Sequence, residues 1–352
     1  MRVVILGSGA VGCLFAALLD EAGHDVALVA RDSPSGNARA ARLRACGLVL
    51  KRHGFDAVVL APERLATMLV PAAEALTTCE AVIVTVKRNG NAWVGGLLRD
   101  HAPATATVAC AQNGLGQADE VLGGSAPWAG VVLDGMLSVS VNYRDDGGGA
   151  APEVVTYSPR AQERLALDGS QGAAAATVAA ALQGAAFTSA AVADIGAAQR
   201  TKIILNQNNA VSALFGFSVR RAITTSTSRR LMAGCMLEAK SAFEAQGFAL
   251  DEKLLGPLKL LALPDWLFDC AFPLMAHLLP ADEFESSMNQ DIFDAGRSTE
   301  VAYLNGAVVA AGEAAGVPTP LTARVLAVVQ DMEAGRRPRA RLTTDDAAAF
   351  FD

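Results

Sequence analysis

The chain has 352 residues, of which 52% are hydrophobic and 18% charged, so it can bury a core large enough for two domains. Its formal net charge of −7 argues against nucleic acid as the main partner, because phosphate binding needs a concentrated basic face. No leader peptide is recognised, and charges and prolines interrupt the apolar stretch 254–279, so no membrane association is expected. Six scattered cysteines predict free thiols, no metal site and a cytoplasmic location.

The first half of the chain alternates β-branched segments with helical ones, which is typical of βαβ units and a parallel sheet. A helix rich in alanine and leucine is expected over 10–22, and an alanine-rich surface helix over 172–182. The strands of the parallel sheet are predicted at 2–6, 25–30, 81–86 and 104–111. More polar strands should then finish this sheet in antiparallel orientation, at 131–141, 153–157 and 164–168.

Strand patterns disappear from about residue 195 onward. Helices are predicted there at 197–215, 224–246, 267–279, 299–315 and 321–333. We therefore expect a Rossmann-type, doubly wound α/β domain over 1–192, an all-α domain over 193–335 and a flexible tail over 336–352. The apolar stretch 254–279 should pack in the core, and a homodimer contact is the alternative.

A glycine-rich motif joins the first predicted strand to the helix that follows it. Gly7 permits a tight turn, Gly9 lets the backbone approach a pyrophosphate, and Gly12 lets the helix pack closely on the strand. The helix N-terminus then offers N–H groups and the positive end of its dipole to the phosphates. The predicted dinucleotide turn consists of Gly7, Ser8, Gly9, Ala10, Val11 and Gly12.

The residues after the second strand distinguish between two nicotinamide cofactors. Arg31 favours the 2′-phosphate of NADP, and Arg42 and Arg44 could add to the same basic patch. Asp32 could instead accept hydrogen bonds from the ribose hydroxyls of NAD. We expect NADP(H) and keep NAD as the alternative.

Polar residues also follow two strands of the predicted sheet, where a doubly wound fold binds its ligands. Lys87 and Asn113 should face this crevice, whereas Arg88 and Asn89 are interpreted as a solvated loop. These strand-end positions predict that Lys87 and Asn113 belong to the binding site.

The helical half carries a second polar pattern. Lys202 and Asn206 are four residues apart and share a helical face. Several asparagines follow inside an apolar helix, against helix propensity, which favours a site over a scaffold. Glu300 lies at the start of the last long helix but one, where an acid ordinarily belongs to the capping turn.

Together these segments resemble the ketopantoate reductase (2-dehydropantoate 2-reductase) family. The resemblance covers residues 1–333 and rests on seven motifs in order, namely GxGAxG, VAR, VTVK, QNG, KxxxN, SSMxxD and GRxTExxxxNG. It implies a Rossmann domain, a helical domain and a cleft between them for a small 2-oxo acid. It further implies reduction of the ketone of 2-dehydropantoate to pantoate by NADPH, on the pathway to pantothenate.

The resemblance also implies roles for individual residues. Lys202 takes the place of the catalytic lysine, which polarises the ketone and donates a proton, and Glu300 that of the acid that binds the substrate hydroxyl. A positioned ammonium suits this step, because hydride transfer leaves negative charge on the ketone oxygen. Positions near the cofactor correspond to Arg31, Lys87 and Asn113, and substrate-binding positions to Asn113, Lys202, Asn206, Asn209 and Ser287.

Three positions depart from the family pattern. Gly90 replaces a glutamine, and Ala210 stands where a second asparagine is usual, so that Asn209 serves only if the helix is shortened or bulged. One extra residue also separates Ser287 from the last motif. These departures support an alternative, a reductase of the same family for another small 2-oxo acid. A non-catalytic NADP-binding sensor is less favoured, because Lys202 and Glu300 are both present.

Overall fold

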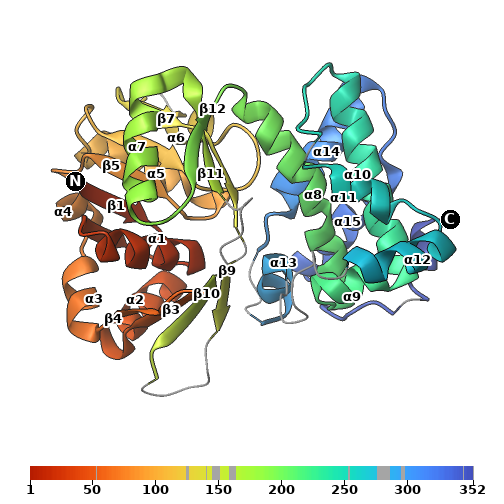
Figure 1. Ribbon diagram of the computed structural model, residues 1–352, viewed down its shortest axis with the longest axis horizontal. Coiled ribbons are helices and arrows are strands. Elements are labelled where there is room, and N and C mark those ends of the chain that lie inside the picture. The colour runs from red at the N-terminus through yellow and green to blue at the C-terminus, as the bar shows by residue number, and fades with distance from the viewer. Residues whose placement is uncertain are drawn as a thin grey trace. The chain divides into compact units, whose positions relative to one another are not determined.

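The computed structural model describes residues 1–52, 54–123, 127–139, 141–144, 151–157, 164–252, 254–275, 286–294, 298–343 and 345–351. The chain divides into two compact units, Met1–Ile195 and Gly196–Asp352 (Figure 1). The first unit is built on a parallel sheet with helices on its faces, and the second unit is helical where it is described. This architecture confirms the predicted fold class.

The first unit centres on a five-stranded parallel sheet. Its strands, in spatial order, are β2 (Asp25–Val29), β1 (Arg2–Leu6), β5 (Ala81–Val84), β6 (Thr107–Cys110) and β7 (Val131–Leu133). The chain runs from β1 to β2 on one side and later returns to β5 on the other, so the winding reverses between β1 and β5. Ligands bind doubly wound folds at such a reversal, beyond the carboxyl ends of the strands.

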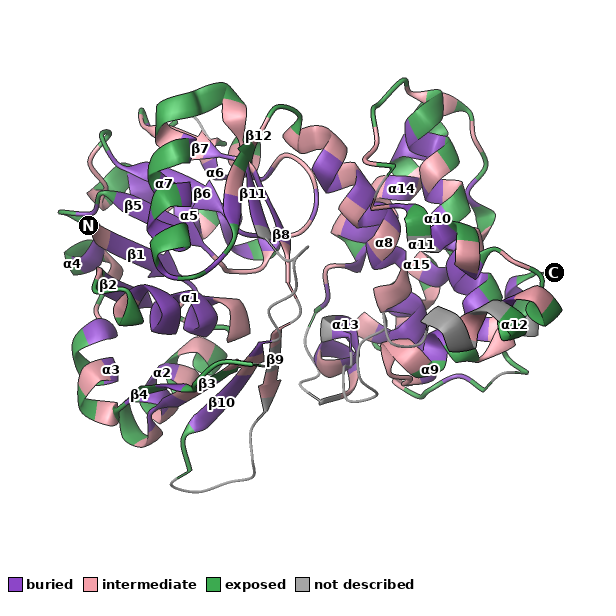
Figure 2. Cartoon of the chain, viewed as in Figure 1, coloured by how far each residue is buried: buried purple, intermediate pink, exposed green. Residues whose placement is uncertain are grey.

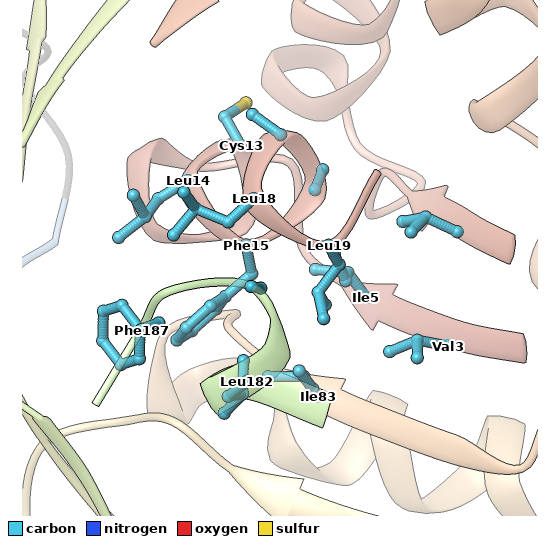
Figure 3. Packing of buried hydrophobic residues seen from close by; sticks show 14 of the residues in the cluster. Val3, Ile5, Cys13, Leu14, Phe15, Leu18, Leu19, Ile83, Leu182 and Phe187 are labelled. Carbon is cyan, nitrogen blue, oxygen red and sulfur yellow. The ribbon is translucent and has the colours of Figure 1, made fainter. Parts of the chain in front are cut away.

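Both faces of this sheet are buried, which explains why its strands are almost continuously apolar (Figure 2). Helices α1 (Ala10–Glu21) and α7 (Gly172–Gly184) cover one face, and α4 (Ala72–Leu76), α5 (Asn91–His101) and α6 (Gln117–Leu122) cover the other. Figure 3 shows Phe15 of α1 pointing toward Phe187, with the two rings edge to face at 5.1 Å between centroids. Large aromatic pairs of this kind anchor helices to sheets.

The strands beyond residue 128 do not finish the central sheet as antiparallel strands, and that prediction is wrong. β7 joins the sheet in parallel orientation. Two smaller sheets form instead, with the orders β12 (Ser189–Val192), β11 (Arg164–Asp168), β8 (Gly135–Ser138) and β4 (Val58–Leu60), β3 (Leu48–Arg52), β10 (Glu153–Tyr157), β9 (Val141–Arg144).

Long-range pairing explains this difference. The buried carboxylate of Glu153 in β10 lies 3.6 Å from Arg39 and 3.5 Å from Arg42, both on helix α2 (Pro34–Cys46). Strand β10 also pairs in parallel with β3, which immediately follows that helix. Alternation along a strand does not specify such partners, because they come from a distant part of the chain.

In the described residues, the second unit contains α-helices, a π-helical turn and a 3-10 turn at Ala348–Phe350. The α-helices and the π turn are α8 (Ile195–Phe215), α9 (Val219–Thr224), α10 (Ser226–Ala245), α11 (Gly256–Leu261), α12 (Asp265–Met275), α13 (Ser287–Asn289), the π turn Gln290–Asp294, α14 (Val301–Ala315) and α15 (Pro320–Glu333). Helices α10, α14 and α15 pack on one another. Within the described part of the stretch 254–279, Leu255, Leu258 and Phe268 are buried, as expected of core residues, and 276–279 lie outside the described residues.

The segment after residue 335 packs on the helical unit, contrary to the expected flexible tail. The backbone N–H of Leu342 donates to the carbonyl oxygen of Leu214 at 2.7 Å. Arg324 donates to the carbonyl oxygen of Phe350 at 2.8 Å, and the side chains of Ala347 and Phe350 are buried. The polar composition suggested fraying, but polar residues of the segment also contact the helical unit, since Arg339 Nη1 donates to the carbonyl oxygen of Ile292 at 3.0 Å.

Candidate active site

The glycine motif forms the turn from β1 to α1. Gly7 has φ +122°, and a Cβ on it would lie 2.8 Å from the backbone nitrogen of Val86. A Cβ on Gly12 would lie 1.8 Å from the carbonyl oxygen of Gly7, so helix and strand can meet only without it. Gly9 is different, because a Cβ there would meet no atom within 4 Å. Its glycine is not required by the packing of the chain, and an open backbone here suits the approach of a pyrophosphate.

The N-terminus of α1 presents unpaired donors. Gly9 is the N-cap residue, no side chain caps the helix, and its first turn contains no acidic residue. The free N–H groups and the positive dipole end are therefore available to an anion. Of the other predicted turn residues, Ser8 is buried, whereas Ala10 and Val11 are partly exposed. These features fit a dinucleotide phosphate.

Thr85, which the sequence analysis missed, holds this turn in place. Its Oγ1–H shares its proton between two acceptors, the carbonyl oxygen of Gly7 at 2.9 Å and that of Leu6 at 3.1 Å. The backbone N–H of Gly7 donates to Val29 of β2 at 2.9 Å. A hydroxyl directly after a buried strand was the available signal, but its partner is 78 residues away.

Arg31 lies beyond the end of β2, near the strand-end loop of β5. Its Nη1 donates to Asn89 Oδ1 at 3.4 Å. The adjacent Asp32 accepts a hydrogen bond from Asn37 Nδ2 at 3.0 Å. A Cβ at Gly90 would lie 3.9 Å from Arg31 Nη1 and only 3.0 Å from Val86 Cγ2, so this residue leaves little room for a side chain.

Arg42 and Arg44 do not extend the predicted basic patch. Arg42 pairs with Glu153, as described above, and Arg44 donates to the carbonyl oxygen of Leu69 at 2.7 Å. Both arginines thus contribute to the packing of α2.

Lys87 and Asn113 follow β5 and β6, and both are half-buried. These strands are neighbours, with Val84 opposite Cys110, and Val84 is also opposite Leu6 of β1. The structure therefore brings the glycine turn, Lys87 and Asn113 to the same edge of the central sheet.

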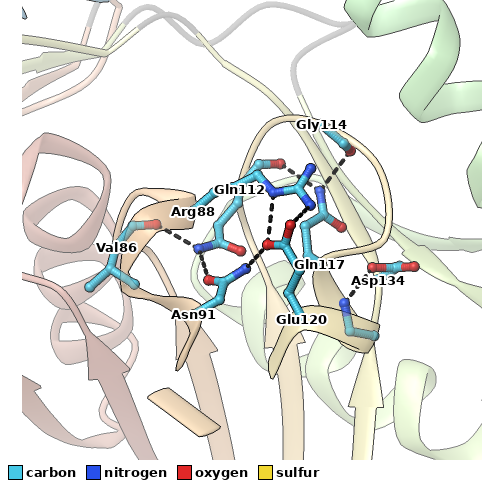
Figure 4. A network of polar contacts seen from close by, with 9 residues as sticks. Val86, Arg88, Asn91, Gln112, Gly114, Gln117, Glu120 and Asp134 are labelled. Carbon is cyan, nitrogen blue, oxygen red and sulfur yellow. Dashed lines mark hydrogen bonds and ion pairs between the residues drawn. The ribbon is translucent and has the colours of Figure 1, made fainter. Parts of the chain in front are cut away.

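Arg88 is not a solvated loop residue, and that interpretation is wrong. Only 7% of it is exposed, and its guanidinium pairs with Glu120 of α6, with Nε 3.0 Å from Oε2 (Figure 4). Beside this pair, burial raises the pKa of the Asp134 carboxyl above its usual value, although the N–H of Ala118 donates to it at 2.8 Å. Polar groups that are wholly or partly buried therefore lie beneath the carboxyl ends of β5 and β6.

Helix α8 carries the lysine and the asparagines on one stripe. Lys202, Asn206 and Asn209 are related by steps of four and three residues, so they share a face. The helix runs without a bulge from Ile195 to Phe215, and Ala210 is fully buried. The helix therefore has neither the bulge nor the shortening that was expected. Asn209 needs neither, because the i+7 position already lies on the same helical face as Lys202.

Two polar contacts tie this helix to the rest of its unit. Asn305 Nδ2 of α14 donates to Gln207 Oε1 of α8 at 2.7 Å, and neither residue is exposed. Ser286 Oγ donates to the carbonyl oxygen of Asn209 at 3.2 Å. Sequence reasoning did not assign roles to Gln207 or Asn305, although a buried amide inside a helix was a signal.

Glu300 is the residue before the first turn of α14, yet its side chain makes no capping hydrogen bond. Thr299 supplies that cap instead, since its Oγ1 accepts from the backbone N–H of Val301 at 3.1 Å. The ordinary structural role expected of this acid is therefore taken by its neighbour, and a role for its carboxylate in substrate binding stays a prediction.

Ser287 begins α13, but its side chain is outside the described residues, as are residues 295–297 of the last motif. The π turn Gln290–Asp294 follows directly. A π turn takes up one residue more than an α turn, and such turns often derive from single insertions near functional sites. It provides a place for the extra residue between Ser287 and Glu300.

Within the described ranges, no cluster of three or more histidine, cysteine, aspartate and glutamate side chains could bind a metal ion. No helix in the same ranges has the length and apolar character needed to cross a membrane.

A glycine turn at the reversal of a parallel sheet, together with a helical unit that carries a lysine on a polar stripe, is typical of an oxidoreductase that binds a dinucleotide cofactor. Comparison with known families identifies which one. Residues 3–148 match the family described as Ketopantoate reductase PanE/ApbA, and residues 194–333 match its C-terminal part. The chain belongs to the ketopantoate reductase family.

Individual relatives agree with this assignment. The 2-dehydropantoate 2-reductase of Archaeoglobus fulgidus is 28% identical over 337 residues, which cover 95% of this chain and 98% of the relative. The crystal structure of a ketopantoate reductase from Ralstonia eutropha is 25% identical with a TM-score of 0.72, covering 96% of this chain and 99% of the other. The dimeric ketopantoate reductase of Staphylococcus aureus shares the fold, at 18% identity and a TM-score of 0.69, with 96% and 100% covered.

Proposed function

We propose that the chain is an NADPH-dependent 2-dehydropantoate 2-reductase, which reduces the C2 ketone of 2-dehydropantoate to pantoate in pantothenate biosynthesis. The observation that carries the proposal is the likeness to the Archaeoglobus fulgidus enzyme, which extends over 95% of the chain and 98% of the relative. A likeness of this extent includes both the glycine turn of the first unit and the polar stripe of α8.

The chemistry assigned to the helical unit follows from charge. When bound, the reduced nicotinamide supplies a hydride to the ketone carbon, and negative charge then develops on the ketone oxygen. We assign Lys202 as the group that stabilises this charge and donates the proton, because an ammonium does both. Its neighbours on the stripe, Asn206 and Asn209, are suited to bind the substrate carboxylate and hydroxyl as neutral donors.

Glu300 and the remaining substrate positions complete the assignment. The Glu300 carboxylate accepts the hydrogen bond of a substrate hydroxyl, a role that is compatible with the cap supplied by Thr299. Ser287 and Asn113 are assigned to the substrate by the family resemblance, and Asn113 and Lys87 also to the nicotinamide side of the cofactor.

NADP(H) is the proposed cofactor because of Arg31, whose guanidinium suits a 2′-phosphate. Asp32, the residue that would favour NAD, already accepts a hydrogen bond from Asn37. We expect Arg31→Gln to raise the Kd for NADPH by about tenfold to a hundredfold, which is the cost of one hydrogen bond to a charged group. The Kd for NADH should change little in the same titrations. Equal losses for both cofactors would mean that Arg31 contacts a group common to both, which would contradict its role at the 2′-phosphate.

Substrate specificity tests the main proposal and its alternative. Loss of NADPH absorbance is followed with 2-dehydropantoate and with a panel of other small 2-oxo acids. The proposal expects the highest kcat/KM for 2-dehydropantoate. Turnover of other 2-oxo acids alone would favour the alternative reductase, which is suggested by Gly90 and Ala210. Tight NADPH binding with no turnover at all would leave only the sensor.

Two further properties belong to this proposal. A homodimer is expected by analogy with the dimeric Staphylococcus aureus enzyme. A cytoplasmic location is compatible with six free cysteines, since thiols persist in a reducing compartment.

A further inference from the structure

We propose that a buried polar network beneath the carboxyl ends of β5 and β6 positions Asn113, and that Gln117 is its central positioning residue. The inference rests on the proposed function, which gives Asn113 a binding role. The side chains of this network come from the segments after both strands and from the first turns of α5 and α6 (Figure 4). They are the buried residues Arg88, Asn91, Gln112 and Gln117 and the partly exposed Glu120.

Gln117 contacts the chain on both sides of Asn113. It is the first residue of α6 and is fully buried. Its Nε2 donates to the carbonyl oxygen of Gly114 at 2.9 Å and to that of Gln112 at 3.3 Å. A carboxamide nitrogen has two protons, so one side chain can hold the carbonyl groups of the residues on either side of Asn113.

Gln112 links the same loop to the neighbouring strand end. Its Nε2 donates to the carbonyl oxygen of Val86 and to Asn91 Oδ1, both at 2.7 Å. Val86 directly precedes Lys87, so this amide sets the spacing between the two loops that carry predicted cofactor residues. The distance from Asn113 to Lys87 is thereby determined by buried bonds rather than by solvated side chains.

Arg88 holds the other flank of Asn113. Gly114 has φ +97°, and a Cβ on it would lie 2.4 Å from Arg88 Nη1, so the guanidinium packs directly on this glycine. Arg88 is itself oriented by two hydrogen bonds to Glu120, whose Oε2 also accepts from Asn91 Nδ2 at 2.8 Å. The cost of removing an ion pair from water offsets much of its electrostatic attraction, so this pair contributes little net stability. Its paired hydrogen bonds instead fix the orientation of the Arg88 guanidinium.

The loop would be poorly ordered without these contacts. It contains two glycines with positive φ, Gly114 and Gly116. Glycine has access to many backbone conformations, so a loop with two of them loses much conformational entropy when it is ordered. Asn113 remains half-buried at the edge of the sheet that carries the glycine turn. If the loop is ordered before a ligand arrives, binding no longer has to offset the conformational entropy lost on ordering it. The network therefore acts on ligand binding through Asn113.

A double-mutant cycle tests this inference. Gln117→Met keeps the volume of the side chain and removes both donors. The Kd for NADPH and the kcat/KM for 2-dehydropantoate are measured for Gln117→Met, Asn113→Ala and the double variant, with Tm alongside. We expect Gln117→Met to impair one or both constants about tenfold in the wild-type background, and less than about twofold when Asn113 is already alanine.

A matched variant separates positioning from general destabilisation. Ser189 is also buried and donates to the carbonyl oxygen of Leu165 at 2.9 Å in the same unit, so Ser189→Ala removes a comparable bond elsewhere. It should lower Tm as Gln117→Met does, with NADPH Kd and kcat/KM near wild type. If Gln117→Met does not fold, Arg88→Lys replaces it, because lysine keeps the charge but loses the paired geometry.

Two results would overturn the inference. Equal losses from Gln117→Met in both backgrounds would mean that it does not act through Asn113, and wild-type constants for Gln117→Met would mean that it positions nothing. Failure of the proposed function looks different, because the wild-type protein would then not turn over 2-dehydropantoate, whereas the cycle on the Kd for NADPH could still be measured.

Discussion

The glycine turn of the first unit and the polar stripe of α8 in the second differ in what determines their residues. At Gly7 and Gly12, backbone atoms occupy the space that any Cβ would need, at 2.8 Å and 1.8 Å. The fold itself requires glycine there. The helix α8 makes no such demand for Lys202 or Asn206, because alanine would favour the helix at either position. Backbone packing thus explains the glycines of the turn, whereas only a role in binding or catalysis explains the polar residues of the stripe.

Gly9 stands between these two cases. It belongs to the turn, yet the structure leaves open space where its side chain would be. Its glycine is explained by a ligand rather than by the chain. Substitutions at these positions therefore distinguish residues that maintain the fold from residues that bind or react.

The largest effect is expected at the stripe. Lys202→Ala should lower kcat by about 10²–10⁴-fold, the usual contribution of a general acid, while the Kd for NADPH stays within about twofold of wild type. Steady-state kinetics and fluorescence titration measure the two quantities. Lys259→Ala, an exposed lysine on α11, is the matched control and should leave both unchanged. A kcat near wild type for Lys202→Ala would show that the stripe does not carry the proton donor.

A second effect separates chemistry from structure at the start of α14. Glu300→Gln should lower kcat/KM by about tenfold to a hundredfold with little change in Tm, because Thr299 makes the cap. Thr299→Ala should do the opposite and cost about 0.5–2 kcal/mol of unfolding free energy. Thermal unfolding and steady-state kinetics of both variants measure these two effects. If Glu300→Gln lost stability and kept its kcat/KM, its role would be structural.

The smallest effect sharpens the comparison inside the turn. Gly9→Ala should weaken NADPH binding about tenfold, with little change in Tm, since its Cβ would meet no atom of the chain within 4 Å. Gly12→Ala should instead cost about 1–3 kcal/mol of stability, because its Cβ collides with backbone. Isothermal titration and thermal unfolding give both values. A loss of stability at Gly9 with unchanged binding would assign that glycine to the fold.

Much of the fold follows from local patterns in the sequence. The first strands, the glycine turn and the long helices were predicted because each depends on residues close together in the chain. The partners of β8 to β12 were not, since they depend on contacts such as that of Glu153 with Arg39. Polar composition likewise concealed the packing of Leu342 and Phe350 in the last segment.

The candidate site divides in the same way. Lys202, Asn206, Lys87 and Asn113 could be proposed from a helical face or a strand end. The supporting residues could not. Arg88 looked solvated because its partner, Glu120, lies 32 residues further on, and Gln117 has a role only once the loop around Asn113 is folded.

Transfer of labelled hydride tests the central claim most directly. The protein is incubated with 2-dehydropantoate and NADPH deuterated at the transferable position of the nicotinamide, and the product is analysed by mass spectrometry and NMR. The account predicts pantoate with deuterium on C2, formed in equal amount to the NADP released. Absence of labelled pantoate, with the deuterium retained in NADPH, would contradict it.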